Sequence, residues 1–357
     1  MKYLLRLLAV VDSSRIRLLL DIYHSQIQER KVVEVIRAAK DQIGYVHTIA
    51  RLPPFLAGGR RKDKAVDKIR YSEMLPQEIL VRRQKFPAAF IGLGGLEWHG
   101  DHQAVGLDAL KAETLCERAA ARSGGFAFPT LWYGEPRVHR LMEFTFDRNS
   151  AIKGRMGFKP EKFIDTYFGT TGQQQIEFYQ ALLWHLLIQM NTLEMKAVCL
   201  FGGHGPLRDF AQPVVERFNA AFHDTQAYAG HEVDYVPLET NPPSNAEVAA
   251  PYFRAPNVAE GGASDSPTRE VWYREHVGTD HAAKWETAYL MYLRPDCVDM
   301  SVYLGRESEP LIGVNGLDPR TTATVEIGRK AAELIVAGMT TKAQELIQRV
   351  SDELDTH

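Results

Sequence analysis

The sequence has few cysteines, and none of them forms a motif. Its 357 residues include only Cys116, Cys199 and Cys297, and no two are close enough for a CxxC pair. This spacing excludes a zinc ribbon and a dithiol redox motif. An odd number of scattered cysteines is typical of reduced thiols in the cytoplasm, which is the location we predict.

Long apolar runs are also lacking. The most suggestive segment, residues 1–11, is interrupted by Arg6 and followed directly by Asp12. It is much shorter than the ~20 apolar residues of a transmembrane helix. No small-residue cleavage site closes it, as a signal peptide would require. We therefore predict no contact with a membrane.

There is no strong excess of charge of one sign. The net charge is -3, which gives no overall attraction to nucleic acid, and we expect a small-molecule substrate instead. The charges are unevenly placed, because residues 1–70 hold 15 basic and 7 acidic side chains. We predict a basic, poorly ordered N-terminal extension over residues 1–70, which is a tail, an oligomerisation arm or the product of a misassigned start codon. A catalytic domain over residues 71–357 would follow it.

Three short apolar runs alternate with longer helical patterns. The runs at Ala88–Leu93, 124–131 and 196–201 are typical of buried parallel strands. Helices are predicted at 74–83, 108–122, 173–190, 286–293, 322–336 and 341–354. Residues 241–266, rich in Pro, Asn, Gly and Ser, predict a long loop. This alternation predicts an α/β fold, a three-layer fold with a mainly parallel sheet flanked by helices.

Side chains that can bind metals are concentrated directly after the first of these strands. Glu97, His99, Asp101, His102 and Asp108 lie within 12 residues, among glycines that allow sharp turns. Carboxylate oxygens and imidazole nitrogens are the ligands of Zn²⁺ and Mn²⁺. The alternatives are a polar surface loop and a dinucleotide site, but Glu97 replaces the third glycine of the G-x-G-x-x-G pattern and would repel phosphates. Because ligands bind beyond the carboxyl ends of strands in such folds, we favour a metal site.

Two smaller clusters follow later in the chain. His204 lies among glycines directly after the strand at 196–201, and His281 and Glu286 lie where a predicted helix begins. A carboxylate in the first turn of a helix is near the positive end of the helix dipole. Taken alone, each cluster is more typical of an ordinary loop. Their combination with the first cluster indicates a metal site.

The three clusters together resemble the creatininase (creatinine amidohydrolase) family of metal-dependent hydrolases. The resemblance rests on G-x-x-E-x-H-G-x-H-x(5)-D at 94–108, on G-H-G at 203–205 and on H-A-x-x-x-E-T at 281–287. It covers the chain from about residue 71 to its end. It implies the three-layer fold of that family and a closed homo-oligomer.

The resemblance also implies a role for each matching residue. The family holds two divalent metal ions, commonly zinc or manganese. The metal ligands implied here are Glu97, His99, Asp108, His204 and Glu286, with Asp108 as the bridge between the ions. The catalytic residues implied are His281, as a proton shuttle at the substrate, and His102, which would lie behind the ligands.

Three functions fit this pattern. The first is a dinuclear hydrolase of a small cyclic or formyl amide. The second is a hydrolase that opens a carbon–carbon bond in a cyclic polyol diketone, as a 3-dehydro-scyllo-inosose hydrolase does. The third is a non-catalytic binding protein on the same fold. Pro206 cannot coordinate an ion, whereas creatininases proper can place a carboxylate two residues after the matching histidine, and this argues against creatinine itself as the substrate.

Overall fold

The computed structural model describes residues 18–21, 43–47, 68–138, 141–164, 167, 169–236 and 280–355. The chain divides into two compact units, Met1–Val66 and Asp67–His357. In the first unit, β1 (Leu18–Asp21) and β2 (Ile43–His47) pair in parallel. The order and the role of residues 1–70 stay a prediction, and the loop predicted at 241–266 lies outside the described residues.

The second unit is built on a sheet of four parallel strands. Its strands are β3 (Ala88–Leu93), β4 (Phe126–Ala127), β5 (Ala197–Gly202) and β6 (Gln226–Gly230). Their order in the sheet is β4-β3-β5-β6, and every pairing is parallel. All side chains of β3 and β5 are buried, as expected for a parallel sheet that is covered on both faces.

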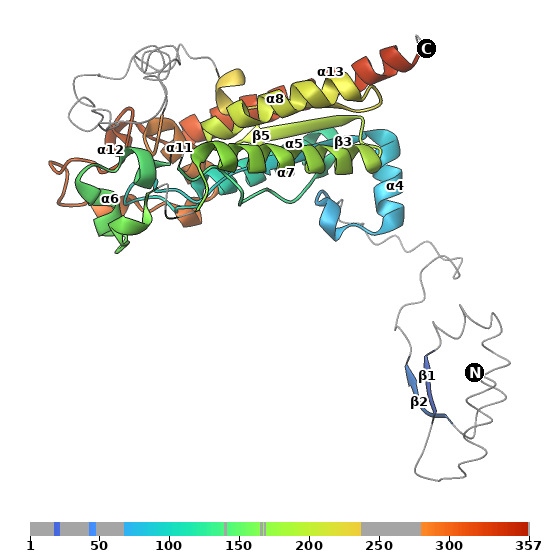
Figure 1. The fold of residues 1–357 in the computed structure, drawn as a ribbon, viewed down its shortest axis with the longest axis horizontal. Helices are drawn as coiled ribbons and strands as arrows, with labels where there is room; N and C mark the ends of the chain where they lie inside the picture. Colours follow the sequence, from blue (N-terminus) through green and yellow to red (C-terminus); the bar gives the residue numbers. More distant parts are fainter. Residues whose placement is uncertain are drawn as a thin grey trace. The chain divides into compact units, whose positions relative to one another are not determined.

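Helices cover both faces of this sheet (Figure 1). Successive side chains of a strand point to opposite faces. Ala88 and Phe90 of β3 therefore pack in one core with α5 (Leu107–Ser123), α11 (Lys284–Leu293) and α13 (Val325–Asp355). Ala89, Ile91 and Leu93 pack in the other core with α7 (Gly172–Thr192) and α8 (Gly205–Ala221). The predicted three-layer α/β fold is confirmed.

The remaining elements are short or lie at the edge of the sheet. They include α4 (Pro76–Lys85), a turn of π-helix η2 (Met142–Phe146), α6 (Ala151–Arg155), the turn η6 (Glu232–Asp234) and α12 (Pro319–Thr322). Among the described residues, no helix is both long and apolar enough to cross a lipid bilayer.

The structure differs from the predicted elements in one strand and in the C-terminal helices. The strand predicted at 124–131 is confined to β4, although Leu131 forms an isolated parallel bridge with Leu93. The two helices predicted at the C-terminus are one helix, α13. Gly338 lies at the predicted break, but a side chain there would collide with the ring of Tyr235. Glycine at this position therefore serves close packing rather than chain reversal.

Candidate metal centre

The residues singled out in the sequence converge at the carboxyl end of the sheet. Glu97 and His99 follow β3, and His204 follows β5. Asp108 lies in the first turn of α5, and Glu286 lies in the first turn of α11. The carboxyl ends of parallel strands share one edge of a sheet, which is where open α/β folds bind their ligands.

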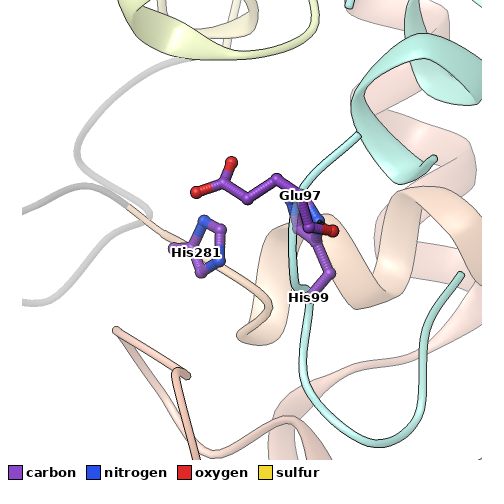
Figure 2. Close-up of side chains that lie close together, drawn as sticks. All are labelled: Glu97, His99 and His281. Carbon is purple, nitrogen blue, oxygen red and sulfur yellow. Dashed lines mark hydrogen bonds between the residues drawn. The ribbon is translucent and has the colours of Figure 1, made fainter. Parts of the chain in front are cut away.

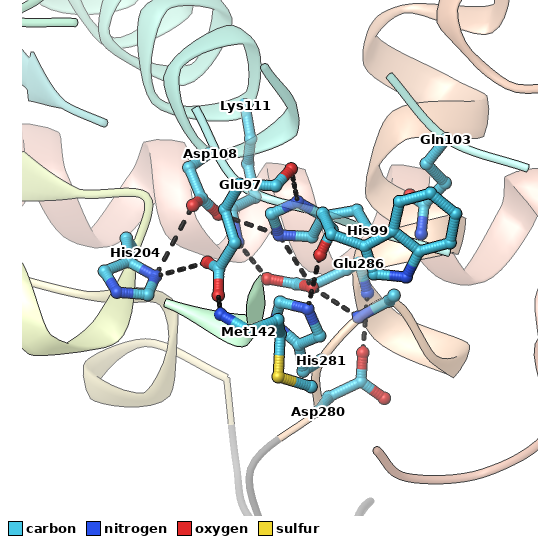
Figure 3. A network of polar contacts seen from close by, with 12 residues as sticks. Glu97, His99, Gln103, Asp108, Lys111, Met142, His204, Asp280, His281 and Glu286 are labelled. Atoms are coloured by element: carbon cyan, nitrogen blue, oxygen red, sulfur yellow. Dashed lines mark hydrogen bonds and ion pairs between the residues drawn. The ribbon is translucent and has the colours of Figure 1, made fainter. Parts of the chain in front are cut away.

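Five of these side chains form two groups that share Asp108 (Figure 3). In the first group, Nε2 of His99 lies 3.3 Å from Oδ1 of Asp108 and 3.6 Å from Oε2 of Glu286. In the second group, Nδ1 of His204 lies 3.0 Å from Oε2 of Glu97 and 3.4 Å from Oδ2 of Asp108. Each oxygen of Asp108 therefore belongs to a different group, and all five side chains are buried.

These atoms fit divalent ions. Apart from their ion-pair contacts within the cluster, Oε2 of Glu97, Nε2 of His99 and both carboxylate oxygens of Asp108 are buried without a hydrogen-bond partner among the described residues. Buried polar atoms without a hydrogen-bond partner destabilise a protein unless an ion or a water molecule interacts with them. Ligand atoms about 2.0–2.1 Å from a tetrahedral ion lie roughly 3.3 Å from one another. The measured separations of 3.0–3.6 Å agree with that spacing.

Backbone contacts orient the candidate ligands His99 and Glu97. Nδ1 of His99 lies 3.1 Å from the carbonyl oxygen of Glu97, which can only accept a hydrogen bond. Nδ1 therefore carries the proton, and Nε2 is left to face Asp108. Oε1 of Glu97 accepts a hydrogen bond from the backbone N–H of Met142 at 2.6 Å, so that Oε2 faces His204.

The electrostatics of the cluster favour positive charge. Burial lowers the pKa of His99, but the carboxylates of Asp108 and Glu286 outweigh burial and raise this pKa to about 10. Burial likewise opposes protonation of His204, yet Glu97 and Asp108 hold its pKa well above the usual range. A site whose carboxylates hold two protonated histidines also suits divalent cations.

His281 lies against this cluster (Figure 2). Its ring stacks on that of His99 with the centroids 4.5 Å apart, and it forms a third possible ligand group with Glu97 and His99. Nε2 of His281 donates a hydrogen bond to the carbonyl oxygen of Trp98 at 2.8 Å. Burial lowers the pKa of His281. Its ring is therefore neutral near pH 7, and Nδ1 is the nitrogen that can accept a proton.

His102 does not join either ligand group. Its Nε2 lies 2.9 Å from Oγ1 of Thr287, and its Nδ1 lies 3.0 Å from the hydroxyl of Tyr303. Burial, followed by the charge of His99, lowers the pKa of His102 to about 4, so that this ring is neutral. His102 therefore lies outside the ligand groups. Through Thr287 it contacts α11, the helix that carries Glu286.

Two charged residues at the cluster were not predicted from the sequence. The ammonium of Lys111 lies 3.1 Å from Oε1 of Glu286 and 2.8 Å from Oε1 of Glu232, which follows β6. Burial raises the pKa of Glu232 to about 7. The sequence did contain one indication of Lys111. It lies three residues after Asp108, and therefore on the same face of the helix, and the positions next to it are apolar. Nothing comparable distinguishes Glu232.

Comparison with known proteins identifies the family. The family model described as creatinine amidohydrolase matches residues 72–343. No curated protein sequence matches the chain. Among solved structures, a manganese form of creatininase and a mutant creatininase complexed with creatine each have 18% identity and a TM-score of 0.50. Each alignment covers 78% of this chain, and it covers 98% of the manganese form and 99% of the creatine complex.

A more distant relative is a putative creatinine amidohydrolase from Bacteroides fragilis, with 15% identity, a TM-score of 0.45 and coverage of 80% of this chain and 98% of its own. The solved structures support the fold, and the family model matches most of the sequence. On that match, this chain belongs to the creatininase family of metal-dependent amidohydrolases.

Proposed function

We propose that this protein is a dinuclear metal-dependent hydrolase of a small cyclic or formyl amide, with zinc or manganese as its two ions. One observation carries the dinuclear part of the proposal: Asp108 contributes one oxygen to each of two ligand groups. A carboxylate that bridges two ions is typical of two-metal sites, in which the ions lie about 3.5–4 Å apart.

Each of the two ligand groups would hold one ion. His99, Asp108 and Glu286 would hold one ion, and Glu97, Asp108 and His204 would hold the other. When bound, the ions would supply the Lewis acidity that makes water a nucleophile at neutral pH and polarises a carbonyl. The buried position of all five ligands keeps bulk water away from them and strengthens their electrostatic effect.

His281 would move the proton that amide hydrolysis requires. An amide nitrogen leaves only when it is protonated, and a neutral imidazole can take a proton from water and pass it on. The hydrogen bond from Nε2 to the Trp98 carbonyl fixes the ring and assigns this role to Nδ1. The stacking of His281 on His99 keeps the ring beside the candidate ligands (Figure 2).

An amide is the substrate class that the family description supports, and a neighbouring structure contains creatine. Pro206 lies two residues after His204 and offers no ligand atom, so we propose an amide other than creatinine.

We further propose that the protein acts as a homo-oligomer in the cytoplasm. Light scattering of the purified protein tests the assembly, and a monomer at all concentrations would contradict it.

Elemental mass spectrometry of the purified protein is the first test. We expect about two divalent ions per chain, because two ligand groups share one carboxylate. Asp108→Ala is expected to lose both ions. The matched control is Asp101→Ala, which removes a carboxylate of the same loop that pairs with Arg155, 3.3 Å away, and belongs to neither group.

The outcome also decides which substrates are tested. Two ions that are lost only in Asp108→Ala would justify a screen of cyclic and formyl amides, followed by oxidised inositols. If only the oxidised inositols were hydrolysed, the bond that the enzyme breaks would be a carbon–carbon bond and not an amide bond. A protein that takes up no zinc or manganese would be a binding protein on this fold.

A further inference from the structure

Lys111 is a fully buried lysine that touches the metal centre without belonging to it. It lies on α5, and its ammonium is shared between Oε1 of Glu232 and Oε1 of Glu286, at 2.8 and 3.1 Å. It also lies 5.7 Å from the centre of the Tyr289 ring. A buried ammonium is unfavourable unless it is paired. Lys111 thus ties a candidate metal ligand to the segment that follows β6.

The contacts of Glu286 show what this ion pair does. Oε1 is held by Lys111 (Figure 3), and Oε2 accepts a hydrogen bond from the backbone N–H of Ala282 at 2.7 Å. The same Oε2 lies 3.6 Å from Nε2 of His99. With both oxygens anchored, the carboxylate can present only one of them to the ligand group. Loss of the contact at Oε1 would free the carboxylate to rotate.

The two ligand groups differ in this respect. Among the described residues, no lysine or arginine forms an ion pair with Glu97 or Asp108, the two carboxylates of the other group. The group that contains Glu286 therefore has a cationic support that the other group lacks. Partners behind a metal ligand typically change the affinity for the ion by about 10- to 100-fold.

We propose that Lys111 is a positioning residue for one of the two ions. By holding Oε1 of Glu286, it directs Oε2 at His99 and Asp108 and sets the affinity of the His99–Asp108–Glu286 group. The Glu97–Asp108–His204 group does not depend on it. This inference rests on the proposed dinuclear function.

The test uses a double variant that keeps the charge balanced. Lys111→Met alone would leave two neighbouring carboxylates, Glu232 and Glu286, without the cation that they share, and would so destabilise the fold. Lys111→Met combined with Glu232→Gln removes one positive and one negative charge and keeps both side chains near their original size. The control is Glu232→Gln alone, in which Lys111 still contacts Glu286. Thermal unfolding of the metal-free proteins compares their folds.

Zinc affinity is then measured by competition with a chromophoric chelator. We expect the wild-type protein to bind two ions. In the double variant, one dissociation constant should rise by about 10- to 100-fold and the other should stay unchanged. Glu232→Gln should keep both constants close to those of the wild type.

Each other outcome overturns the inference in a distinguishable way. If the wild type binds two ions and the double variant binds them equally well, Lys111 does not position Glu286. If both constants weaken together, Lys111 supports the fold as a whole rather than one group. A wild type that binds fewer than two ions contradicts the proposed dinuclear function itself, and this inference fails with it.

Discussion

Oδ1 of Asp108 lies 3.3 Å from Nε2 of His99. The other oxygen of the same carboxylate faces His204 at 3.4 Å, so Asp108 stands between two groups that have no other member in common. Substitutions at Asp108 and at His204 should therefore have different effects on metal content.

His204→Ala is expected to lose one ion and to keep the other. It removes a ligand from one group only, whereas Asp108→Asn weakens both groups because an amide offers a single, uncharged oxygen. Elemental analysis after dialysis should give about one ion per chain for His204→Ala and close to none for Asp108→Asn. Loss of both ions in His204→Ala would show that the two groups are not separate sites.

Zinc binding to the metal-free protein should release protons at pH 7. The carboxylates hold the pKa of His99 at about 10 and that of His204 well above the usual range, so both rings are protonated below those values. A histidine must lose its ligating proton before it can bind a metal, and about two protons should therefore leave. Affinity should fall as the pH falls, because protons compete for the same nitrogens.

Calorimetry in buffers of different ionisation enthalpy measures this release. The observed heat should change with the buffer, and His204→Ala should release about one proton fewer. A binding heat that is the same in every buffer would contradict the protonated state of the metal-free cluster.

Gly203→Ala should weaken the site through the backbone. Gly203 lies between β5 and His204, and a side chain there would run into the backbone carbonyl of Asp108. The strand end and α5 would have to separate, which moves His204 away from Asp108. Overpacking of this kind costs about 1–3 kcal/mol of unfolding free energy. The control is Gly154→Ala in α6, where a side chain meets no atom within 4 Å.

Urea unfolding and elemental analysis test this prediction together. Gly203→Ala should unfold at lower urea and hold less metal, whereas Gly154→Ala should be unchanged or more stable by about 0.5–1 kcal/mol. Equal stability and equal metal content in the two variants would mean that neither the fold nor the metal site requires the close approach of Gly203 to Asp108.

The framework of the fold could be predicted because its strands are short apolar runs with clear ends. Ala88–Leu93 lies between Pro87 and Gly94, and β3 has these bounds. The helix α8 was not predicted, because Gly205 and Pro206 are typical of a loop. Proline is also favoured in the first turn of a helix, where its missing N–H is not needed, and α8 begins in this way.

The candidate site was predictable for a different reason. The candidate ligands lie directly after strands or in the first turn of a helix and match a known pattern, and the structure brings Glu97, His99, Asp108, His204 and Glu286 together. The contact of Lys111 with Glu232 joins residues 121 positions apart. It depends on where β6 lies in the sheet, and no local pattern in the sequence fixes that position. The position of Lys111 in its helix marked it as unusual, but its partners Glu232 and Glu286 could be identified only from the structure.

His102→Ala should lower activity without removing metal. The ring of His102 contacts Thr287, whose hydroxyl lies 3.4 Å from the carbonyl oxygen of Ala282, and Ala282 follows His281. Ala282 has a φ of 52°, a conformation that a non-glycine residue adopts only when its surroundings hold it. Without His102 this turn should relax and displace His281, and a displacement of about 1 Å can reduce kcat roughly 100-fold.

The measurement combines kcat on the amide substrate with metal content. The control is His185→Ala, which removes an exposed histidine of α7. His102→Ala should keep both ions and lose kcat, with about 1–3 kcal/mol of stability lost because the buried hydrogen bonds of His102 to Thr287 and Tyr303 are removed. Loss of the ions in His102→Ala would make His102 part of the ligand set. An unchanged kcat would show that the turn at Ala282 holds His281 in place without help from His102.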